Sequence, residues 1–275
     1  MQFKSAFLCQ ILAILFMCNL ACTKKNTPTP ATTPAPTPIP TKDTPAVPTP
    51  VAEKPHLPTK LESDNLMITF KYLDNIRNVT EIESSDGTKE IYMYKETGQL
   101  NKYERYQKKE RKYVIDYILN EAGAVTRANQ YAVESGTVLT PAGYYLIEYD
   151  AETRISKVSW YNTRKQLLSE ATRTYSADRA SLKIITTGQN AGVIDYTFDS
   201  KKAWCSSINH SQVLSIESLP GLLLSNANNI SKMSGDSTDG QAKTYTYTYD
   251  ADNFPTSWIE TDAKGSRKTV KITYR

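Results

Sequence analysis

The sequence predicts an all-β fold, an antiparallel meander of hairpins that repeats about every 25 residues. Two observations predict it. The stretch Lys243–Phe254 alternates tyrosine and threonine before four turn-forming residues, as the two faces of a strand entering a hairpin require. Large residues also precede similar turns along the chain, at Tyr72, Tyr94, Leu119, Tyr149, Tyr175, Phe198, Leu224 and Tyr249.

Each repeat has room for two strands and two turns, but not for a crossover helix. Neighbouring strands are therefore expected to be antiparallel. Turn signals mark the opposite ends of the hairpins, at Ser84–Gly87, Glu134–Gly136, Thr187–Asn190 and Asp262–Gly265. Eight repeats imply roughly 16 strands, more than an open sheet holds without curling. We therefore expect a strongly curved sheet, a part-closed barrel or a sandwich of two sheets, with bulges where the spacing slips by one residue.

Residues 1–21 have the pattern of a lipoprotein signal peptide. Lys4 precedes an apolar run from Ala6 to Leu20, and Ala21 stands directly before Cys22. The run is shorter than the roughly 20 residues that a membrane helix needs. We predict that Cys22 becomes the first mature residue and carries the lipid. An ordinary cleaved signal and an uncleaved anchor are the alternatives.

Residues 22–60 are predicted to be a tether that includes the lipidated cysteine. They are dominated by Pro, Thr and Ala, and prolines at this density remove backbone donors and fix φ near the polyproline value, so no core can form. A polyproline ligand for a groove-type domain is the alternative. His56 falls inside this tether. Residues 61–275 are then the β-repeat domain, long enough for one sizeable core.

The segment from Cys205 to Gly240 breaks the rhythm of the repeats. Val213–Ile216 and Leu219–Leu224 are apolar without alternation, and Pro220–Gly221 would interrupt a strand. We expect a loop with one helical turn that covers an end of the sheet. It acts either as a lid over a cavity or as a plug of the core.

The stretch Tyr245–Thr256, with Leu224–Lys232 before it, resembles the C-terminal part of Bacteroidota lipoproteins of a domain-of-unknown-function family. It is also similar, more distantly, to the YD repeats of Rhs and teneurin shells. Asn253 stands where members usually have glycine, and both residue types accept a positive φ. The resemblance implies an exported, repeat-built antiparallel sheet and brings no enzymatic activity with it.

Few residues of the predicted domain suggest chemistry. His210 is its one histidine, which argues against a histidine metal cage or a Ser-His-Asp triad, and we expect it at the surface. Cys205 has no partner and is expected to be a small buried hydrophobe. Asp150, Asp199 and Asp250 occupy turn positions, where bonds from side chain to backbone explain them. We therefore predict no catalytic residue, no metal and no cofactor.

The charge balance argues against nucleic acid as a partner. The chain has 33 Lys and Arg against 29 Asp and Glu. The short basic run Lys108–Lys112 is interrupted by Glu110 and is typical of a solvated turn. The start of a calcium loop at residues 250–253 lacks an acidic ligand at the twelfth position, where Thr261 stands.

Tyrosine is the notable residue type, with 18 in the chain and all of them after residue 71. Tyrosine can close a thin sheet core or offer a flat face to a ligand. The candidates for ligand stacking are Tyr245, Tyr247, Tyr249 and Trp258. We predict a non-enzymatic binding or scaffolding lipoprotein of the cell envelope. The alternatives are a glycan-binding surface lipoprotein with an aromatic strip and a periplasmic lipid or lipoprotein carrier with a concave sheet.

The predicted partners are the membrane, through the lipid, and a glycan, peptidoglycan or an envelope protein. Lys24 and Lys25 follow the lipidation site and suit anionic head groups. Acidic residues, which accompany surface export in the resembled lipoproteins, do not stand there. We therefore expect an outer-membrane lipoprotein that faces the periplasm, with the cell surface as the alternative.

Overall fold

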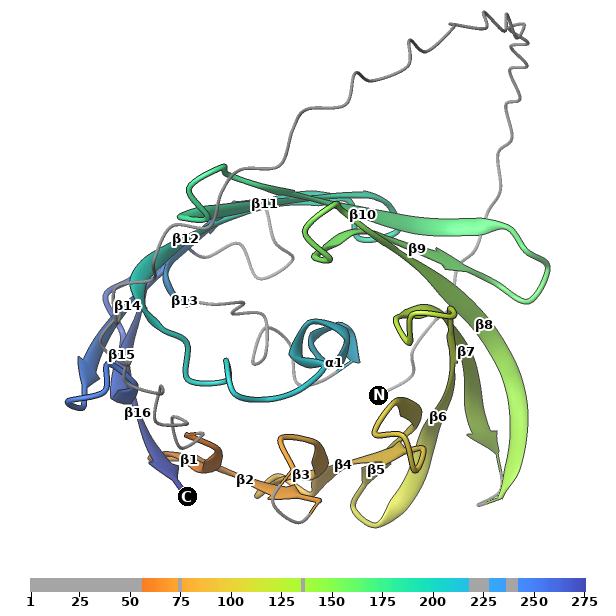
Figure 1. The fold of residues 1–275 in the computed structure, drawn as a ribbon, viewed down its shortest axis with the longest axis horizontal. Coiled ribbons are helices and arrows are strands. Elements are labelled where there is room, and N and C mark those ends of the chain that lie inside the picture. The colour runs from red at the N-terminus through yellow and green to blue at the C-terminus, as the bar shows by residue number, and fades with distance from the viewer. Residues whose placement is uncertain (1–55, 74–75, 135–136, 218–227, 236–241) are drawn as a thin grey trace, which may run out of the picture. The chain divides into compact units, whose positions relative to one another are not determined.

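The computed structural model describes residues 56–73, 76–134, 137–217, 228–235 and 242–275. Within these ranges, sixteen antiparallel strands form one closed barrel (Figure 1). Each strand pairs with its neighbours in sequence, and the last strand pairs back to the first, with Leu61 opposite Ile272. The predicted antiparallel meander is confirmed. Of the three predicted forms it takes the barrel, fully closed rather than part-closed, and the sandwich does not form.

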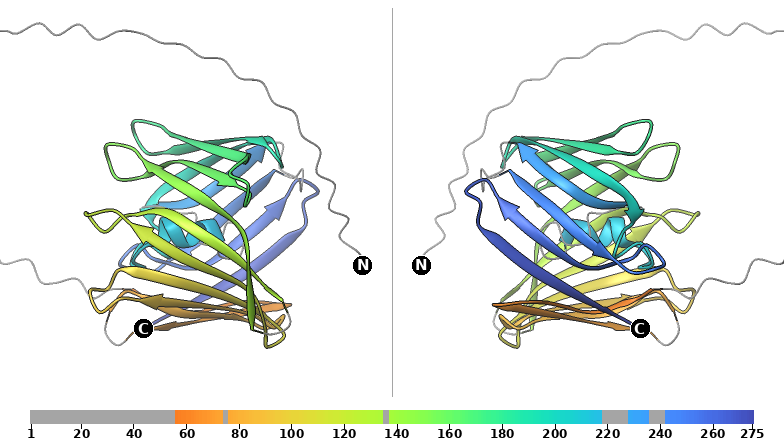
Figure 2. Two further views of the ribbon diagram at one scale, coloured as in Figure 1. Left: turned by 90° about the vertical axis from the view of Figure 1, so that its right-hand side faces the viewer. Right: turned by 90° about the vertical axis from the view of Figure 1, so that its left-hand side faces the viewer.

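The strands run as follows: β1 (Pro58–Ser63), β2 (Leu66–Tyr72), β3 (Val79–Ser84), β4 (Thr88–Tyr94), β5 (Leu100–Gln107), β6 (Glu110–Leu119), β7 (Val125–Glu134), β8 (Val138–Tyr149), β9 (Ile155–Tyr161), β10 (Leu167–Tyr175), β11 (Ser181–Gly188), β12 (Gly192–Lys202), β13 (Asn228–Gly235), β14 (Lys243–Tyr249), β15 (Pro255–Asp262) and β16 (Arg267–Tyr274). The strands are inclined to the barrel axis, as closure requires (Figure 2).

Each strand turns one face to the barrel interior. In β2, Ile68 and Phe70 are buried, whereas Met67 and Lys71 beside them are exposed. The tyrosines of β14 are half-buried and the threonines between them are exposed, as the alternation predicted. The buried apolar and aromatic side chains of the sheet therefore face inward, whereas a few apolar ones, among them Met67, Ile118 and Ile185, are exposed.

The aspartates of the repeat build turns. One carboxylate oxygen of Asp150 accepts hydrogen bonds from the backbone N–H groups two and four residues later, both at 2.9 Å. Thr153 adopts a φ of 60° in this turn. Asp250 does the same, with Asn253 at a φ of 64°. Register shifts accompany the turns after Tyr72, Tyr94, Leu119, Tyr149 and Tyr249.

Tyrosines near the strand ends tie the hairpins together. The hydroxyl of Tyr149, near the end of β8, donates to the carbonyl oxygen of Val125 at the start of β7, at 2.8 Å. The same bond recurs, from Tyr72 to Pro58, Tyr94 to Val79, Tyr175 to Ile155, Tyr247 to Ile230 and Tyr274 to Pro255. Each such bond contributes about 1 kcal/mol. The spacing of the tyrosines in the sequence thus reflects a repeated contact between strand ends.

The residues Ala203–Glu217, called the plug below, leave β12 and lie inside the ring of strands (Figures 1 and 2). They include the helix α1 (Ser211–Glu217). Trp204, Val213 and Leu214 belong to the same buried cluster as the inward residues of the sheet. The core-plug interpretation is therefore correct for this segment, and the lid interpretation is not. Residues 219–224 lie outside the described ranges.

We call the end of the barrel at which the plug enters the plug end. Asn209 binds there to the turn after β2: its N–H donates to the Arg77 carbonyl oxygen at 2.9 Å, and its side-chain amide donates to Asn78 at 2.8 Å. The N–H of Ile155 donates to the side-chain oxygen of Gln212 at 3.0 Å. The opposite end, where the hairpins β7/β8 and β11/β12 turn, is called the cavity end.

The folded domain starts earlier than residue 61. Leu57 is 3% exposed, and its carbonyl oxygen accepts the N–H of Arg275 at 3.0 Å. The ring of His56 stacks on Phe254 with centroids 4.1 Å apart. The prediction that His56 belongs to the tether is therefore wrong. The proline-rich composition hid β1, because Pro58 is the first residue of that strand, a position where proline is tolerated.

Candidate binding site inside the barrel

The outer face of the barrel is charged. Glu81 lies between Lys71 and Lys89, with nitrogen to oxygen distances of 2.7 and 2.6 Å. Further ion pairs join Arg111 to Glu104 at 3.1 Å, Lys157 to Glu148 at 2.6 Å and Lys60 to Glu62 at 2.7 Å. Thr244, Thr246 and Thr248 are also exposed on this side. An outer face of this kind is suited to water.

The interior is apolar and rich in tyrosine. Tyr92, Tyr103 and Tyr145 are among the largest fully buried side chains. Burial raises the pKa of all three hydroxyls, because the phenolate form loses its hydration. These tyrosines stay neutral and supply hydrogen-bond donors inside the barrel.

Two glutamates lie among these tyrosines. Glu90 is 1% exposed, and its carboxylate accepts hydrogen bonds from Tyr92 at 2.9 Å and Tyr103 at 3.2 Å. Glu217 ends α1 in the interior. Burial, assisted by the charge of Glu90, raises its pKa to about 7 against the opposing effects of Tyr145 and Gln130. The interior thus holds an acid that titrates near neutral pH.

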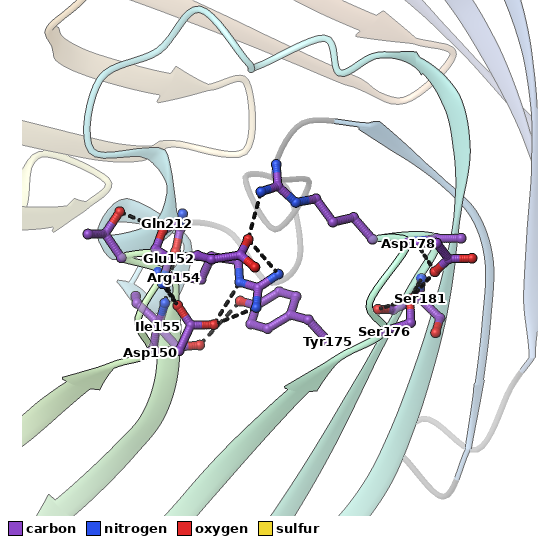
Figure 3. A network of polar contacts seen from close by, with 12 residues as sticks. Asp150, Glu152, Arg154, Ile155, Tyr175, Ser176, Asp178, Ser181 and Gln212 are labelled. Atoms are coloured by element: carbon purple, nitrogen blue, oxygen red, sulfur yellow. Dashed lines mark hydrogen bonds and ion pairs between the residues drawn. The ribbon is translucent and has the colours of Figure 1, made fainter.

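The plug is held by the turn between β8 and β9, as Figure 3 shows. Asp150 binds Arg154 in an ion pair at 2.7 Å, and the guanidinium lies 4.4 Å from the centre of the Tyr175 ring. The next backbone N–H, that of Ile155, donates to Gln212 of α1. The carboxylate of Asp150 therefore fixes the turn that holds the helix, as its predicted structural role requires.

A cavity of about 420 Å³ lies toward the cavity end, between β7 and β12. It is lined by Gln130, Ala142, Trp160, Tyr161, Leu168, Ser169, Thr186, Gln189, Asn190, Gly192 and Ile194. Trp160 packs against the buried cluster, and its ring lies 6.2 Å from that of Tyr145. The volume lies within the range of about 300–1,000 Å³ typical of small-molecule sites.

Gln130 lies between this cavity and the carboxyl group of Glu217. It lines the cavity, and it also interacts with the carboxyl of Glu217. The hydroxyls of Tyr117 and Tyr145 are buried, and neither has a hydrogen-bond partner of normal geometry among the described residues. The inner wall of the cavity therefore adjoins polar groups that are not fully paired.

The predicted stacking residues lie in the interior. Trp258 is 9% exposed, with its ring centroid 6.3 Å from that of Trp204 and 6.1 Å from that of Tyr247. Tyr245 packs against the same buried cluster, and Tyr249 donates to Asp199. These contacts give the four residues a packing role. A role in ligand stacking stays a prediction.

Three other predictions concern single residues. Cys205 is fully buried and keeps its thiol outside any disulfide, as expected for a small core residue. Asp199, at the end of β12, accepts bonds from Asn229, so its role is structural. The expectation that His210 lies at the surface is wrong: it is half-buried, with Nε2 3.3 Å from the Gly98 carbonyl oxygen. Burial lowers its pKa, because the plug carries it into the barrel mouth.

Sequence reasoning missed Trp160, Gln130, Glu90 and Glu217. The first three face inward from different strands, so only the closed barrel brings them together. Glu217 directly follows the apolar run that ends at Ile216. Its position at the end of a segment with buried residues is the signal in the sequence that could have pointed to a carboxylate in the interior.

In the described ranges, no group of three or more His, Cys, Asp or Glu side chains could hold a metal ion. Within the same ranges, no helix is long and apolar enough to cross a membrane.

The fold and site together define a closed antiparallel barrel with a charged outer face and a plugged interior. No family model matches the chain, and no curated protein matches it. Among solved structures it is similar to a porin-like protein from Bacteroides uniformis, at 17% identity and a TM-score of 0.47, over 79% of this chain and 96% of that one.

A porin-like protein from Bacteroides vulgatus is similar at 10% identity and a TM-score of 0.48, over 80% of this chain and 99% of that one. The complex TcdB2-TccC3-TEV aligns with 78% of this chain and 16% of its own, at 11% identity and a TM-score of 0.20. Likenesses of this degree do not transfer a function, so the function is argued below from the residues of this chain.

Proposed function

We propose that this chain is a cell-envelope lipoprotein, held by a lipid on Cys22, whose barrel is a non-enzymatic binding module that stands in water. The observation that carries the proposal is the polarity of the barrel. A barrel that spans a membrane turns an apolar band outward and is polar inside. Here the ion pairs of Glu81 with Lys71 and Lys89 and of Lys157 with Glu148 face outward, and the apolar and tyrosine-rich cluster faces inward.

The magnitudes favour water outside the barrel. A Lys or Arg on the lipid-facing side at the bilayer midplane costs about 2–4 kcal/mol. Lys71, Lys89, Arg111 and Lys157 stand on the outer face, in strands β2, β4, β6 and β9. Because these costs would accumulate, attachment to a membrane calls for a separate anchor. Cys22, with the signal pattern before it, supplies one.

Binding is favoured over catalysis by the state of the carboxylates. Asp150 and Asp199 are occupied by backbone and side-chain donors that hold turns and strands. Glu90 is held by two tyrosines. The described residues that line the cavity beside Trp160 do not include a nucleophile paired with a general base. We therefore propose a binding or scaffolding role.

For location we propose the outer membrane with the barrel in the periplasm. Lys24 and Lys25 would lie near the lipid head groups, where each contributes about 1 kcal/mol. Protease treatment of intact cells, read with an antibody to the barrel, tests this. We expect the antibody signal to persist until the outer membrane is permeabilised. Loss of the antibody signal in intact cells would instead place the barrel at the cell surface.

Fractionation tests the anchor. Replacement of Cys22 alone removes the predicted lipoprotein processing site and leaves the signal peptide attached. The variant therefore carries Asn19→Ala together with Cys22→Ala. The first change creates the Ala-x-Ala pattern of an ordinary cleavage site over positions 19–21. Mass spectrometry confirms that the mature chain starts at residue 22. We expect the wild-type protein in carbonate-washed membranes and the double variant in the soluble fraction.

The matched control is Cys18→Ala, which removes a cysteine of the signal and should leave the protein in the membrane fraction. A correctly cleaved double variant that still resists carbonate would mean that the barrel itself is inserted in the bilayer. The proposal would then be wrong.

A further inference from the structure

We propose that the cavity beside Trp160 binds a neutral saccharide. This inference rests on the proposed binding function and names its ligand class. The first ground is the absence of charge: none of the described residues that line the cavity is ionisable at neutral pH. A phosphate, a carboxylate or an amine ligand would meet no partner charge in this lining.

The second ground is the mixture of groups. Gln130, Gln189 and Asn190 offer side-chain amides, each of which both donates and accepts hydrogen bonds. Thr186 adds a hydroxyl, and the Ser169 hydroxyl, whose proton goes to a backbone carbonyl oxygen, adds an acceptor. A ligand with many hydroxyl groups matches this set, because each of its hydroxyls is also a donor and an acceptor.

The third ground is the aromatic face. Trp160 is half-buried, with its ring against Tyr145, so its position is set by the core while part of its surface stays accessible. Leu168 and Ile194 add further apolar surface. The apolar face of a sugar ring suits a flat ring of this kind, with its hydroxyl edge toward the amides.

Two other ligand classes fit less well. An extended peptide binds sheets by adding a strand to a free edge, and every described strand already has a neighbour on both sides. A lipid chain needs a continuous apolar lining, whereas the side-chain amides of Gln130, Gln189 and Asn190 interrupt the apolar surface here. The exposed Leu139 and Leu167 stand on neighbouring hairpins but do not line the cavity.

The cavity walls are rigid where they carry these groups. A side chain added at Gly188, beside Gln189, would lie 2.3 Å from the Leu168 carbonyl oxygen. The hydroxyl oxygen of Ser169 lies 3.0 Å from the carbonyl oxygens of both Thr187 and Gln189, and its single proton donates to one of them. The turn that presents Gln189 and Asn190 is therefore fixed against β10, as a preformed site requires.

The test is titration calorimetry on the full-length protein in lauryldimethylamine oxide micelles, which carry no sugar. Diacetylchitobiose represents the N-acetylated sugars of the cell wall, and maltose represents plain hexoses. We expect one of the two to bind with a Kd on the order of 1 mM or below. Binding of diacetylchitobiose would indicate an N-acetylated sugar of the cell wall as the ligand, and binding of maltose would indicate a plain hexose. Palmitate serves as the lipid probe.

The variants locate the site. Trp160→Ala should weaken binding about tenfold or more, and Trp160→Phe should restore part of it, because the flat ring returns. Gln189→Ala, on an exposed turn, should weaken binding severalfold without affecting folding. The matched control is Asn101→Ala, an exposed amide on β5, which should leave the Kd unchanged.

Three results would overturn the inference. The first is that neither sugar binds at a concentration about 10-fold above the expected Kd. The second is that sugar binding is insensitive to both Trp160→Ala and Gln189→Ala, and the third is that palmitate binds at the cavity and the sugars do not. None of them bears on the fractionation of the Cys22 variant. The ligand and the anchor can therefore fail separately.

Discussion

Replacement of Glu217 by glutamine should stabilise the barrel at alkaline pH and not at acidic pH. The pKa of this carboxyl is raised from its ordinary value of 4.5 to about 7. Below pH 4.5 both the folded and the unfolded chain hold the proton, so the group has no effect. Between pH 4.5 and 7 the unfolded chain ionises first, and stability falls as pH rises. Above pH 7 the full cost of a buried charge is present.

The magnitude follows from the pKa difference. At about 1.36 kcal/mol per pKa unit, a rise from 4.5 to about 7 corresponds to about 3 kcal/mol. The residue as a whole is half-buried, so its contact with solvent offsets part of this cost. We expect Glu217→Gln to gain about 2 kcal/mol at pH 8.5, or roughly 5 °C in melting temperature for a domain of this size.

The assay is urea unfolding of the wild-type protein and the variant at about pH 4.5 and pH 8.5, on either side of the raised pKa, followed by tryptophan fluorescence. Glutamine keeps the shape of the side chain and a hydrogen-bonding group beside Tyr145 and Gln130. Glu121→Gln, on an exposed turn, is the matched control and should change little at either pH. The reasoning fails if the difference between wild type and Glu217→Gln is the same at both pH values, or if the variant is less stable at the alkaline one.

Two further predictions concern stability. Trp204→Ala, which removes a 5% exposed ring that contacts Phe70 and Trp258, should cost about 3–5 kcal/mol, measured as a lower urea midpoint; a loss below about 1 kcal/mol would mean that the plug does not pack into the core. Asp150→Ala leaves two backbone N–H groups without their acceptor and removes one of the two carboxylates paired with Arg154, and it should cost about 1–2 kcal/mol, with faster amide exchange at Ile155. Unchanged exchange there would separate the turn from the anchoring of α1.

The hairpins could be predicted from sequence because their signals are local. The alternation in Lys243–Tyr249 and the turn aspartates Asp150 and Asp250 act over a few residues, and each appears in the structure where the pattern placed it. Closure could not be predicted. A curved sheet and a closed ring use the same alternation, and they differ only in the pairing of β1 with β16.

The cavity and the interior acid were also beyond local reasoning. Gln130, Trp160 and Ile194 come from β7, β9 and β12, and their meeting depends on the curvature of the ring. The position of His56 was missed for a different reason. It lies between Pro55 and Pro58 at the end of a proline-rich segment, and this composition outweighed the contact with Phe254, which is distant in sequence.

The seam between β1 and β16 sets the order in which the barrel can be completed. Thr59 donates to the Thr273 carbonyl oxygen across it, a contact between residues 214 positions apart. Every other strand pairing joins neighbours in sequence and can form as soon as two strands are present. The first strand must therefore wait for the last, with one edge unpaired, and an unpaired edge invites association with other chains. A chain that lost only β16 would keep nearly all of its hairpins, but it would be an open sheet with two unpaired edges that can pair with other chains.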